Sequence, residues 1–477
     1  MYIYFVGIKG VGMASLAVIA KQAGFEVCGS DIADEFITDK ILQKEKIFFK
    51  TGFSSDNIER FLKGHLRDEV LVVSSAANGG FGNEECVWAR ENGFRIISHG
   101  QAVGEFMSGE IFGKKFKGVS VSGAHGKTTI TALISTLLTL LDLDPSYTVG
   151  TSEIFPLGAG GHFGKGEYFI AEADEYLSEI KEDRKPKFLY QNPEVLIVNN
   201  IDFDHPDFYH NLDEVENAYL DFANQLGKNT LLIVNGDDER VRKIAEKAKK
   251  RMITYGVHAS NNLVLSDFRE FGLSSSFNVS FDKTDLGRFD LSLPGFHNAK
   301  NSLCAIAFLM EIGIPISKIR EVMPKFLGTK RRLEMVGETK NGLKIMDDYA
   351  HHPEEIRKSL NALKEAFPDR KIITIFQPHT YSRTKSLLSE FIASFIDTNK
   401  LILLPTFASK RESSNSIMDE EILLEFNKIK KNVIGIEKFD NVIKYVQQNV
   451  NDKDHLVLTM GAGDVYEIGY QILKHDK

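Results

Sequence analysis

Short apolar runs alternate with helix-forming segments along almost the whole of this 477-residue chain. The first run is YIYFVG at residues 2–7, which is followed by a glycine turn, a helical segment and a second run at 25–31. Such alternation is typical of parallel sheets, because a parallel connection needs a helix-length crossover. The chain also exceeds the roughly 100–200 residues that form one domain. We therefore predict an α/β protein of several domains.

The alternation divides into three parts. The polar, glycine-flanked link GKKFKG, which starts at Gly113, ends the first part, and the turn PGFHNAKN at 294–301 begins the third. Just before that turn, residues 258–293 alternate at the period of antiparallel strands. We predict a Rossmann-like domain over 1–112 and a Rossmann-like C-terminal domain over 294–477. Between them, over 113–293, we predict a P-loop ATPase domain with a parallel sheet and a small antiparallel sheet.

Composition argues against several kinds of partner. The formal net charge of −8 disfavours nucleic acid and anionic membranes. The three cysteines lie far apart, without the spacing of a metal site or a disulfide framework. No apolar run approaches the roughly 18 residues that would span a bilayer. We predict a cytoplasmic protein with no nucleic-acid partner and no membrane insertion.

The segment SGAHGKTT at 122–129 predicts a phosphate-binding loop. It joins an apolar run to a helical segment, so backbone N–H groups and the positive helix end would face an anion. Lys127 would neutralise that anion and a threonine hydroxyl could bind magnesium. Only two residues separate its glycines, whereas the usual loop has four, so a tight turn with a solvated lysine is the alternative. The candidate ATP-binding residues here are Gly123, Ala124, His125, Gly126, Lys127, Thr128 and Thr129.

Two acidic segments follow this loop, each at the end of a predicted strand. They are AEADEY at 171–176 and NNIDFDHPD at 199–207. The carboxyl ends of parallel strands meet at one edge of a sheet, so the segments can converge on the loop. Thr128, Glu175 and His205 would then form a magnesium site. The alternative for any single carboxylate is a solvated strand end.

The first glycine turn resembles part of a dinucleotide fingerprint. It contains Gly7, Gly10 and Gly12, with Ser15 where a third glycine would stand, and Asp31 ends the next strand. Glycine lets the backbone approach a pyrophosphate, and a carboxylate at that strand end can hold a ribose hydroxyl. The pattern indicates a nucleotide or nucleotide-sugar site, with a plain tight turn as the alternative.

Polar side chains gather at two strand ends of the third part. The segments are DDYAHHPEE at 347–355 and FQPHTYSRT at 376–384. Their histidines and arginine are too polar as a group for a core, although one histidine alone would more often be structural. Just ahead, RRLE at 331–334 supplies two adjacent arginines suited to carboxylate or phosphate. We predict a site for small anions.

Taken in order, these segments resemble the motifs of the Mur ligases. The motifs are GAHGKTT, EADEY, NIDFDHPD, PGFHNAKN, KRRLE, DDYAHHPEEI and FQPHTYSRT, and the resemblance extends from residue 3 to about residue 464. It implies a UDP-substrate domain, an ATPase domain that uses ATP and Mg²⁺, and a C-terminal domain that closes over the site. The motifs are most similar to those of the members that join L-alanine to UDP-N-acetylmuramate through an acyl phosphate, in cell-wall synthesis.

The resemblance also implies roles for individual residues. Binding of the UDP substrate is implied for Gly7, Gly10, Gly12, Asp31, Ser74 and Ser75, and His125 would touch its acyl end. Contacts to ATP, besides those of the loop, are implied for His297, Asn298, Asn301 and Arg332. Positioning of the amino acid and the transferred phosphate is implied for Asp348, His351, His352, His379 and Arg383. The catalytic set would be Lys127, His205, His351 and Arg383. We expect a monomer or weak homodimer.

Two segments depart from the family pattern. Residues 177–190 differ from the short sequence that usually follows the acidic motif, which leaves contacts on that side open. Several relatives carry a carbamylated lysine after the DH motif, but Tyr219 stands near that position here. We therefore predict no carbamate and no dependence on bicarbonate.

Three other functions fit part of the sequence. A family member that attaches a ready-made tripeptide to the same nucleotide is the nearest, since KEDRKPKF partly matches its acidic-motif region, whereas FQPHTYSRT favours alanine addition. A dinucleotide-dependent oxidoreductase would explain the first turn but gives no role to the phosphate loop. A non-catalytic nucleotide-sugar sensor would need a damaged ATP site, which the sequence does not show.

Overall fold

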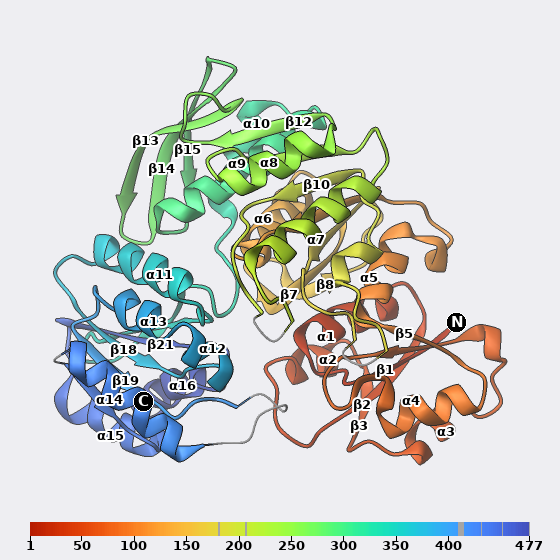
Figure 1. The fold of residues 1–477 in the computed structure, drawn as a ribbon, viewed down its shortest axis with the longest axis horizontal. Coiled ribbons are helices and arrows are strands. Elements are labelled where there is room, and N and C mark those ends of the chain that lie inside the picture. The colour runs from red at the N-terminus through yellow and green to blue at the C-terminus, as the bar shows by residue number, and fades with distance from the viewer. Residues whose placement is uncertain (180–181, 206–207, 409–414, 431, 451, 477) are drawn as a thin grey trace. The chain divides into compact units, whose positions relative to one another are not determined.

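The computed structural model describes residues 1–477 except 180–181, 206–207, 409–414, 431, 451 and 477 (Figure 1). It contains two compact units. Unit 1 comprises Met1–Asp267, Phe277–Asp290 and Lys300–Leu327, and unit 2 comprises Phe268–Ser276, Leu291–Ala299 and Gly328–Lys477. The predicted boundary at 293/294 therefore falls inside a stretch that groups with unit 2. Within the described ranges, no helix has both the length and the apolar character needed to cross a membrane.

The N-terminal part of unit 1 is a parallel sheet of order β3-β2-β1-β4-β5. Its strands are β1 (Tyr2–Val6), β2 (Glu26–Asp31), β3 (Phe48–Thr51), β4 (Val70–Ser74) and β5 (Arg95–Ser98). Its helices are α1 (Val11–Gln22), α2 (Asp39–Lys44), α3 (Ser55–Leu62), α4 (Glu84–Glu91) and α5 (His99–Ser108). Alternate residues of β1 enter two cores, Ile3 and Phe5 with α1 and α5, and Tyr4 and Val6 with α3 and α4. Helices thus cover both faces.

The second sheet has ten strands in the order β15-β14-β13-β12-β11-β10-β6-β9-β7-β8. The bounds are β6 (Lys117–Ser122), β7 (Ser146–Ile154), β8 (Gly158–His162), β9 (Tyr168–Ala173), β10 (Val195–Val198), β11 (Leu231–Asn235), β12 (Met252–Gly256), β13 (Leu263–Phe271), β14 (Ser274–Phe281) and β15 (Thr284–Leu291). Strands β13 to β15 are joined by two-residue turns and so run antiparallel. They extend the parallel sheet through the β12–β13 pairing, rather than forming a separate sheet.

Helices cover the parallel part of this sheet. They are α6 (Lys127–Leu140), α7 (Leu212–Gln225), α8 (Glu239–Ala248), α9 (Phe296–Glu311) and α10 (Ile316–Val322). Tyr219 and Phe222 of α7 and Ile244 of α8 pack with Leu196 and Val198 of β10 in one core. Strands β6, β9 and β10 are parallel neighbours, so the loops at their carboxyl ends open on the same edge.

The third sheet, in unit 2, has the order β16-β17-β21-β18-β19-β20 and is parallel except at β16. Its strands are β16 (Glu334–Glu338), β17 (Lys344–Asp348), β18 (Lys371–Phe376), β19 (Lys400–Leu403), β20 (Val433–Gly435) and β21 (His455–Met460). Its helices are α11 (Pro353–Ala366), α12 (Tyr381–Ser386), α13 (Leu388–Ser394), α14 (Ser416–Ile429), α15 (Phe439–Asn449) and α16 (Tyr466–His475). Two cores lie on opposite faces. The predicted α/β class is confirmed.

Candidate active site

The phosphate loop lies between β6 and α6. Gly123 and Gly126 adopt φ values of +138° and +86°, which disfavour any residue with a side chain. A Cβ atom on Gly126 would lie 2.8 Å from Nδ2 of Asn199 and 3.1 Å from Nδ2 of Asn301. Gly126 is the N-cap of α6, whose first N–H groups have no partner within the helix. The predicted glycine turn at the start of a helix is therefore present, and Asn301 lies beside it.

Lys127 is the first residue of α6 and is largely buried. Its Nζ donates to the carbonyl of Gly123 at 2.6 Å and to the carboxylate of Glu175 at 2.9 and 3.2 Å. Burial opposes its charge, but the Glu175 carboxylate and its neighbours outweigh burial and raise the pKa of Lys127 above its usual value. Lys127 thus carries a positive charge at the loop.

The structure divides the predicted magnesium ligands between two places. The hydroxyl of Thr128 donates to Glu172, not Glu175, at 3.1 Å, and the backbone N–H of Gly150 donates to the other oxygen of Glu172 at 2.6 Å. Glu175 lies instead with Asp174 and His205, whose possible ligand atoms are within 4.8 Å of one another. Carboxylate and hydroxyl oxygens suit a hard cation such as magnesium.

Glu172 is a residue that the motif analysis missed. It lies on β9 between the buried residues Ala171 and Ala173, paired in register with Val121 of β6. Because side chains alternate along a strand, Glu172 points to the face of the sheet opposite to that of its two neighbours. This alternation was visible in AEADEY, so the sequence did contain a signal for Glu172.

Aromatic rings flank the acidic motif. The rings of Tyr176 and His205 lie 4.3 Å apart, and Nε2 of His205 is 3.7 Å from Asp204. Pro206 and Asp207 of the same motif lie outside the described residues. Tyr219 is buried on α7, where burial and the charge of Glu175 raise its pKa. The absence of a carbamate at this position stays a prediction.

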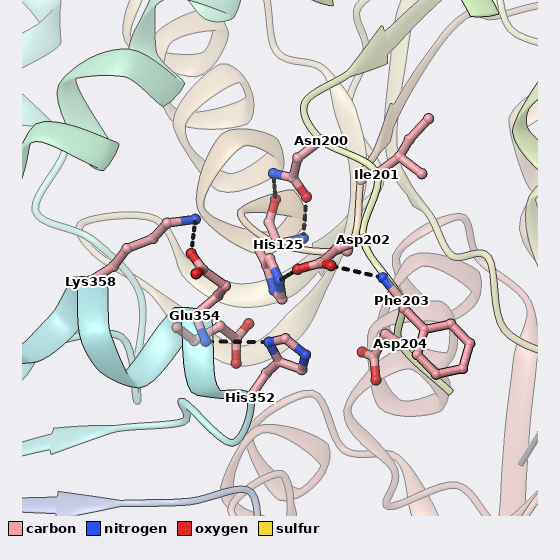
Figure 2. Close-up of polar contacts among 12 residues, drawn as sticks. His125, Asn200, Ile201, Asp202, Phe203, Asp204, His352, Glu354 and Lys358 are labelled. Atoms are coloured by element: carbon pink, nitrogen blue, oxygen red, sulfur yellow. Dashed lines mark hydrogen bonds and ion pairs between the residues drawn. The ribbon is translucent and has the colours of Figure 1, made fainter. Parts of the chain in front are cut away.

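His125 connects the loop to the segment after β10 (Figure 2). Its backbone N–H donates to Oδ1 of Asn200 at 2.8 Å, and its ring Nε2 lies 3.2 Å from Oδ2 of Asp202. Its carbonyl accepts from Asn199 at 3.0 Å and from Asn200 at 2.9 Å. Asn199 also donates to Asn301 at 3.0 Å. The two adjacent asparagines, which the motif analysis did not single out, hold the loop in place.

In the first glycine turn, Gly7 has a φ of +83° and a Cβ there would lie 2.8 Å from Cβ of Ser75. Asp31 is 2% exposed. Its carboxylate accepts the backbone N–H of Lys9 at 2.7 Å and of Ile32 at 2.8 Å. These bonds hold the turn, and the contact between Asp31 and a ribose stays a prediction.

Ser15 stands where a third glycine of the turn would stand. At this residue α1 packs closely against β7 and β8 of the same unit. The hydroxyl of Ser15 donates to the carbonyl of Val149 on β7 at 3.0 Å. A Cβ on Gly161 of β8 would lie 2.1 Å from the carbonyl oxygen of Ser15. Small residues on β8 therefore provide the close approach that a helix glycine usually provides.

The other residues predicted for the UDP-substrate site lie partly at the first glycine turn and partly in the core. Ser74 is buried and lies 3.3 Å from Sγ of Cys86, whereas Ser75 remains at the turn. Gly10 is the N-cap of α1, and a Cβ on Gly12 would lie 2.6 Å from Nε2 of His99. The sequence did not indicate His99, which comes from α5.

Unit 2 brings three of its predicted residues together. The rings of His351 and His379 are 6.0 Å apart, and Arg383 donates to the carbonyl of His379 at 3.3 Å. His379 also stacks on Phe407, with ring centroids 5.9 Å apart. The ring of His352, in contrast, accepts the N–H of Glu354 at 3.4 Å and caps α11 (Figure 2). His352 thus helps to start α11, and its predicted role in positioning the substrate stays a prediction.

The two adjacent arginines of the RRLE motif have different environments. Arg331 is buried, donates to Asp347 at 3.0 Å, and donates to the carbonyls of Gly461 and Gly463. Arg332 keeps 28% of its side chain exposed and lies 3.7 Å from Glu355. Arg331 therefore stabilises unit 2, and Arg332 is the one that could contact a ligand.

The first turn of α9 also uses its polar groups locally. Asn298 donates from Nδ2 to the carbonyl of Pro294 at 2.7 Å. Loss of water and the charge of Lys358 lower the pKa of His297 to about 4, so its ring is neutral at neutral pH. A neutral imidazole can both donate and accept a hydrogen bond, which suits the predicted contact of His297 with ATP.

Asp348 should make the stability of the protein depend on pH. Burial raises the pKa of Asp348 to about 6, although Arg332 and the N–H groups of Ala350 and Leu333 oppose this rise. An unfolded Asp has a pKa of about 3.9, so the folded state holds an extra proton between about pH 4 and about pH 6. Stability from this group is therefore present at the lower pH and lost as the pH rises through that window.

We expect the melting temperature of Asp348→Asn, relative to that of the wild type, to rise across the same window. Calorimetry at several pH values would measure it. A difference between the two proteins that is constant with pH would contradict the raised pKa.

Comparison with known proteins places the whole chain in one family. Models described as Mur ligase family, catalytic domain, Mur ligase middle domain, and Mur ligase, glutamate ligase domain match residues 2–110, 121–309 and 331–463. A UDP-N-acetylmuramate–L-alanine ligase from Desulfitobacterium hafniense is 36% identical over 475 residues, which cover 99% of each chain. The chain belongs to the Mur ligase family. The resemblance of its ordered motifs is thereby confirmed.

Solved structures show that the Mur ligase fold extends over the full length. A UDP-N-acetylmuramate–alanine ligase from Thermotoga maritima aligns with a TM-score of 0.81 at 24% identity and covers 100% of this chain and 99% of its own. A murein peptide ligase from Psychrobacter arcticus aligns with a TM-score of 0.73 at 21% identity, over 99% and 98%. At these identities the likeness shows the fold alone.

Proposed function

We propose that this Mur ligase forms an amide bond between UDP-N-acetylmuramate and L-alanine, with ATP as the energy source, in peptidoglycan precursor synthesis. The observation that carries the proposal is the charged Lys127, which lies against Glu175 at the N-terminus of α6. A relative named for this reaction is 36% identical over almost the full length of both chains, which supports the choice of substrates. We propose that the enzyme acts in the cytoplasm as a monomer or weak homodimer.

In this proposal, ATP places its phosphates on the loop at 123–129. The substrate carboxylate attacks the γ-phosphoryl group, the bond to ADP breaks, and an acyl phosphate forms. The alanine amine then attacks the acyl carbon and phosphate leaves. Lys127 offsets the charge on the transferred group, and the N–H groups of α6 bind it without reorganisation. Exclusion of water protects the acyl phosphate.

Magnesium fits the oxygen-rich set around the loop. Thr128 and Glu172 would hold it, with Glu175, Asp174 and His205 as a neighbouring set. When bound, it would supply positive charge to the phosphates. For the amino acid and the transferred phosphate we propose His351, His379 and Arg383, which unit 2 brings together.

Attachment of a ready-made tripeptide is the second candidate. Its support is KEDRKPKF, which partly matches the acidic-motif region of the tripeptide-adding members, and the fold shared with a murein peptide ligase. FQPHTYSRT at 376–384 favours alanine.

The test compares the two amine donors directly. Phosphate release is measured with magnesium-ATP and UDP-N-acetylmuramate, and either L-alanine or the tripeptide L-alanyl-γ-D-glutamyl-meso-diaminopimelate. We expect turnover with alanine and a product mass that corresponds to its addition. Turnover with the tripeptide alone would replace the first candidate with the second, and turnover with neither would refute both.

A further inference from the structure

Residues 174–179 and 182–188 form the two arms of a hairpin-like loop that starts at the acidic motif. Lys187 N–H donates to the carbonyl of Tyr176 at 2.9 Å, and Phe188 N–H donates to that of Asp174 at 3.0 Å. Near the tip, Ser178 N–H donates to the carbonyl of Lys185 at 2.9 Å. Residues 180–181 lie outside the described ones. Backbone hydrogen bonds thus hold the two arms of the loop together.

This loop docks on the N-terminal part of unit 1. Glu182 accepts two hydrogen bonds from the guanidinium of Arg90, at 2.9 and 3.2 Å. The hydroxyl of Ser178 is hydrogen-bonded to that of Ser98, at the start of α5. The loop therefore connects the end of β9 to the domain that carries the first glycine turn.

Lys187 lies where these two parts meet. A Cβ on Gly100 of α5 would be 3.0 Å from Cα of Lys187, and the preceding residue, His99, contacts Gly12 of the glycine turn. At the other end of the side chain, Nζ of Lys187 is 2.7 Å from Asp174, whose neighbour Glu175 holds Lys127. Lys187 thus extends from the nucleotide-sugar turn toward the phosphate loop.

The proposed reaction requires an anionic group of the substrate between the first glycine turn and the phosphate loop. The diphosphate of UDP-N-acetylmuramate belongs at the glycine turn, and its lactyl carboxylate must reach the γ-phosphate beside Lys127. A lysine ammonium has three donors, and the pair with Asp174 engages one of them. The side chain of Lys187 is also 20% exposed, so a ligand can reach it.

We propose that Lys187 binds the lactyl carboxylate of UDP-N-acetylmuramate and so positions it for attack on ATP. The proposal rests on the function proposed above, and it gives a role to the segment 177–190 that departs from the family pattern. It makes Lys187 a residue that distinguishes a muramoyl nucleotide from one without the lactyl group.

The test uses UDP-N-acetylglucosamine, which has the same nucleotide and sugar but no lactyl carboxylate. Dissociation constants of both nucleotides are measured by calorimetry, without ATP, for the wild type, Lys187→Met and Lys187→Arg. Lys187→Met should raise the dissociation constant of UDP-N-acetylmuramate about 10- to 100-fold, as expected for loss of a charge-assisted hydrogen bond. The dissociation constant of UDP-N-acetylglucosamine should stay within about twofold of the wild-type value. Lys187→Arg should recover most of the loss.

Lys185→Met is the matched control, because Lys185 is exposed on the same loop and lies over the ring of Tyr190. It should change neither constant. Equal weakening of both nucleotides by Lys187→Met would show that Lys187 only supports the loop, and unchanged binding of UDP-N-acetylmuramate would also overturn the proposal. Wild-type turnover with alanine is measured separately, so failure of the proposed function would be recognised independently.

Discussion

Lys127→Ala is expected to lower kcat by about three orders of magnitude or more, while the dissociation constant for UDP-N-acetylmuramate changes by less than about threefold. Lys127 supplies the positive charge at the N-terminus of α6 and is paired with the nearly buried Glu175. Removing it takes charge from the transferred phosphoryl group and leaves a buried carboxylate without its cation. Both effects disfavour binding of the anionic γ-phosphate. The first glycine turn, which we propose binds the nucleotide, belongs to a separate sheet, so its contacts should be unaffected.

Phosphate release under saturating magnesium-ATP measures the first quantity, and calorimetry with UDP-N-acetylmuramate measures the second. Lys117→Ala is the control, because Lys117 begins β6, the strand before the loop, and pairs with Glu167 at the surface. It should retain wild-type activity. Phosphate release by Lys127→Ala at a rate near that of wild type would rule out the proposed ATP site.

The fold could be predicted because local sequence determines it. Apolar runs of strand length alternate with helical segments, and each of the three sheets is built from such units. The strand β6, the glycines with positive φ and Lys127 at the first position of α6 are consecutive in sequence. A motif of this kind carries its own geometry, so its residues were identified correctly as neighbours. The pairing of β12 with β13, which makes the antiparallel strands part of the same sheet, was not predicted, because strand patterns do not show which strands pair.

The hydrogen-bond partners of side chains were harder to predict than the fold. Asp31 was expected at a ribose, and the structure shows that one of its oxygens also accepts the backbone N–H of Lys9. His352 was expected to position substrate, and the structure shows that its ring also caps α11. Either side chain has the chemistry for the predicted role. A motif does not show whether such a side chain must also accept a hydrogen bond from a nearby backbone N–H group.

The choice between Glu172 and Glu175 depends on the same kind of information. Both belong to AEADEY, and the sequence favoured Glu175 for magnesium. In the structure Glu175 neutralises Lys127, whereas Glu172 accepts from the hydroxyl of Thr128. A carboxylate beside the loop threonine can share a cation with it, while one paired with lysine must first give up that partner.

We therefore expect Glu172→Gln to lower kcat about 100-fold and to raise the magnesium concentration needed for half-maximal rate about tenfold or more. Glutamine keeps the size of the side chain and one acceptor for Thr128 or Gly150 but removes the charge that attracts the cation. Glu175→Gln should lower kcat through Lys127 while shifting the magnesium requirement less. Magnesium titrations of phosphate release at saturating ATP distinguish the two effects.

Glu167→Gln is the control, because Glu167 is exposed immediately before β9 and should leave the magnesium curve unchanged. A larger magnesium shift in Glu175→Gln than in Glu172→Gln would return the metal to the residue that the sequence favoured. It would also mean that Lys127 leaves Glu175 when the nucleotide binds, since one carboxylate cannot keep a close lysine pair and bind a divalent cation equally well. The comparison thus reports whether the ion pair seen between Lys127 and Glu175 persists in the working enzyme.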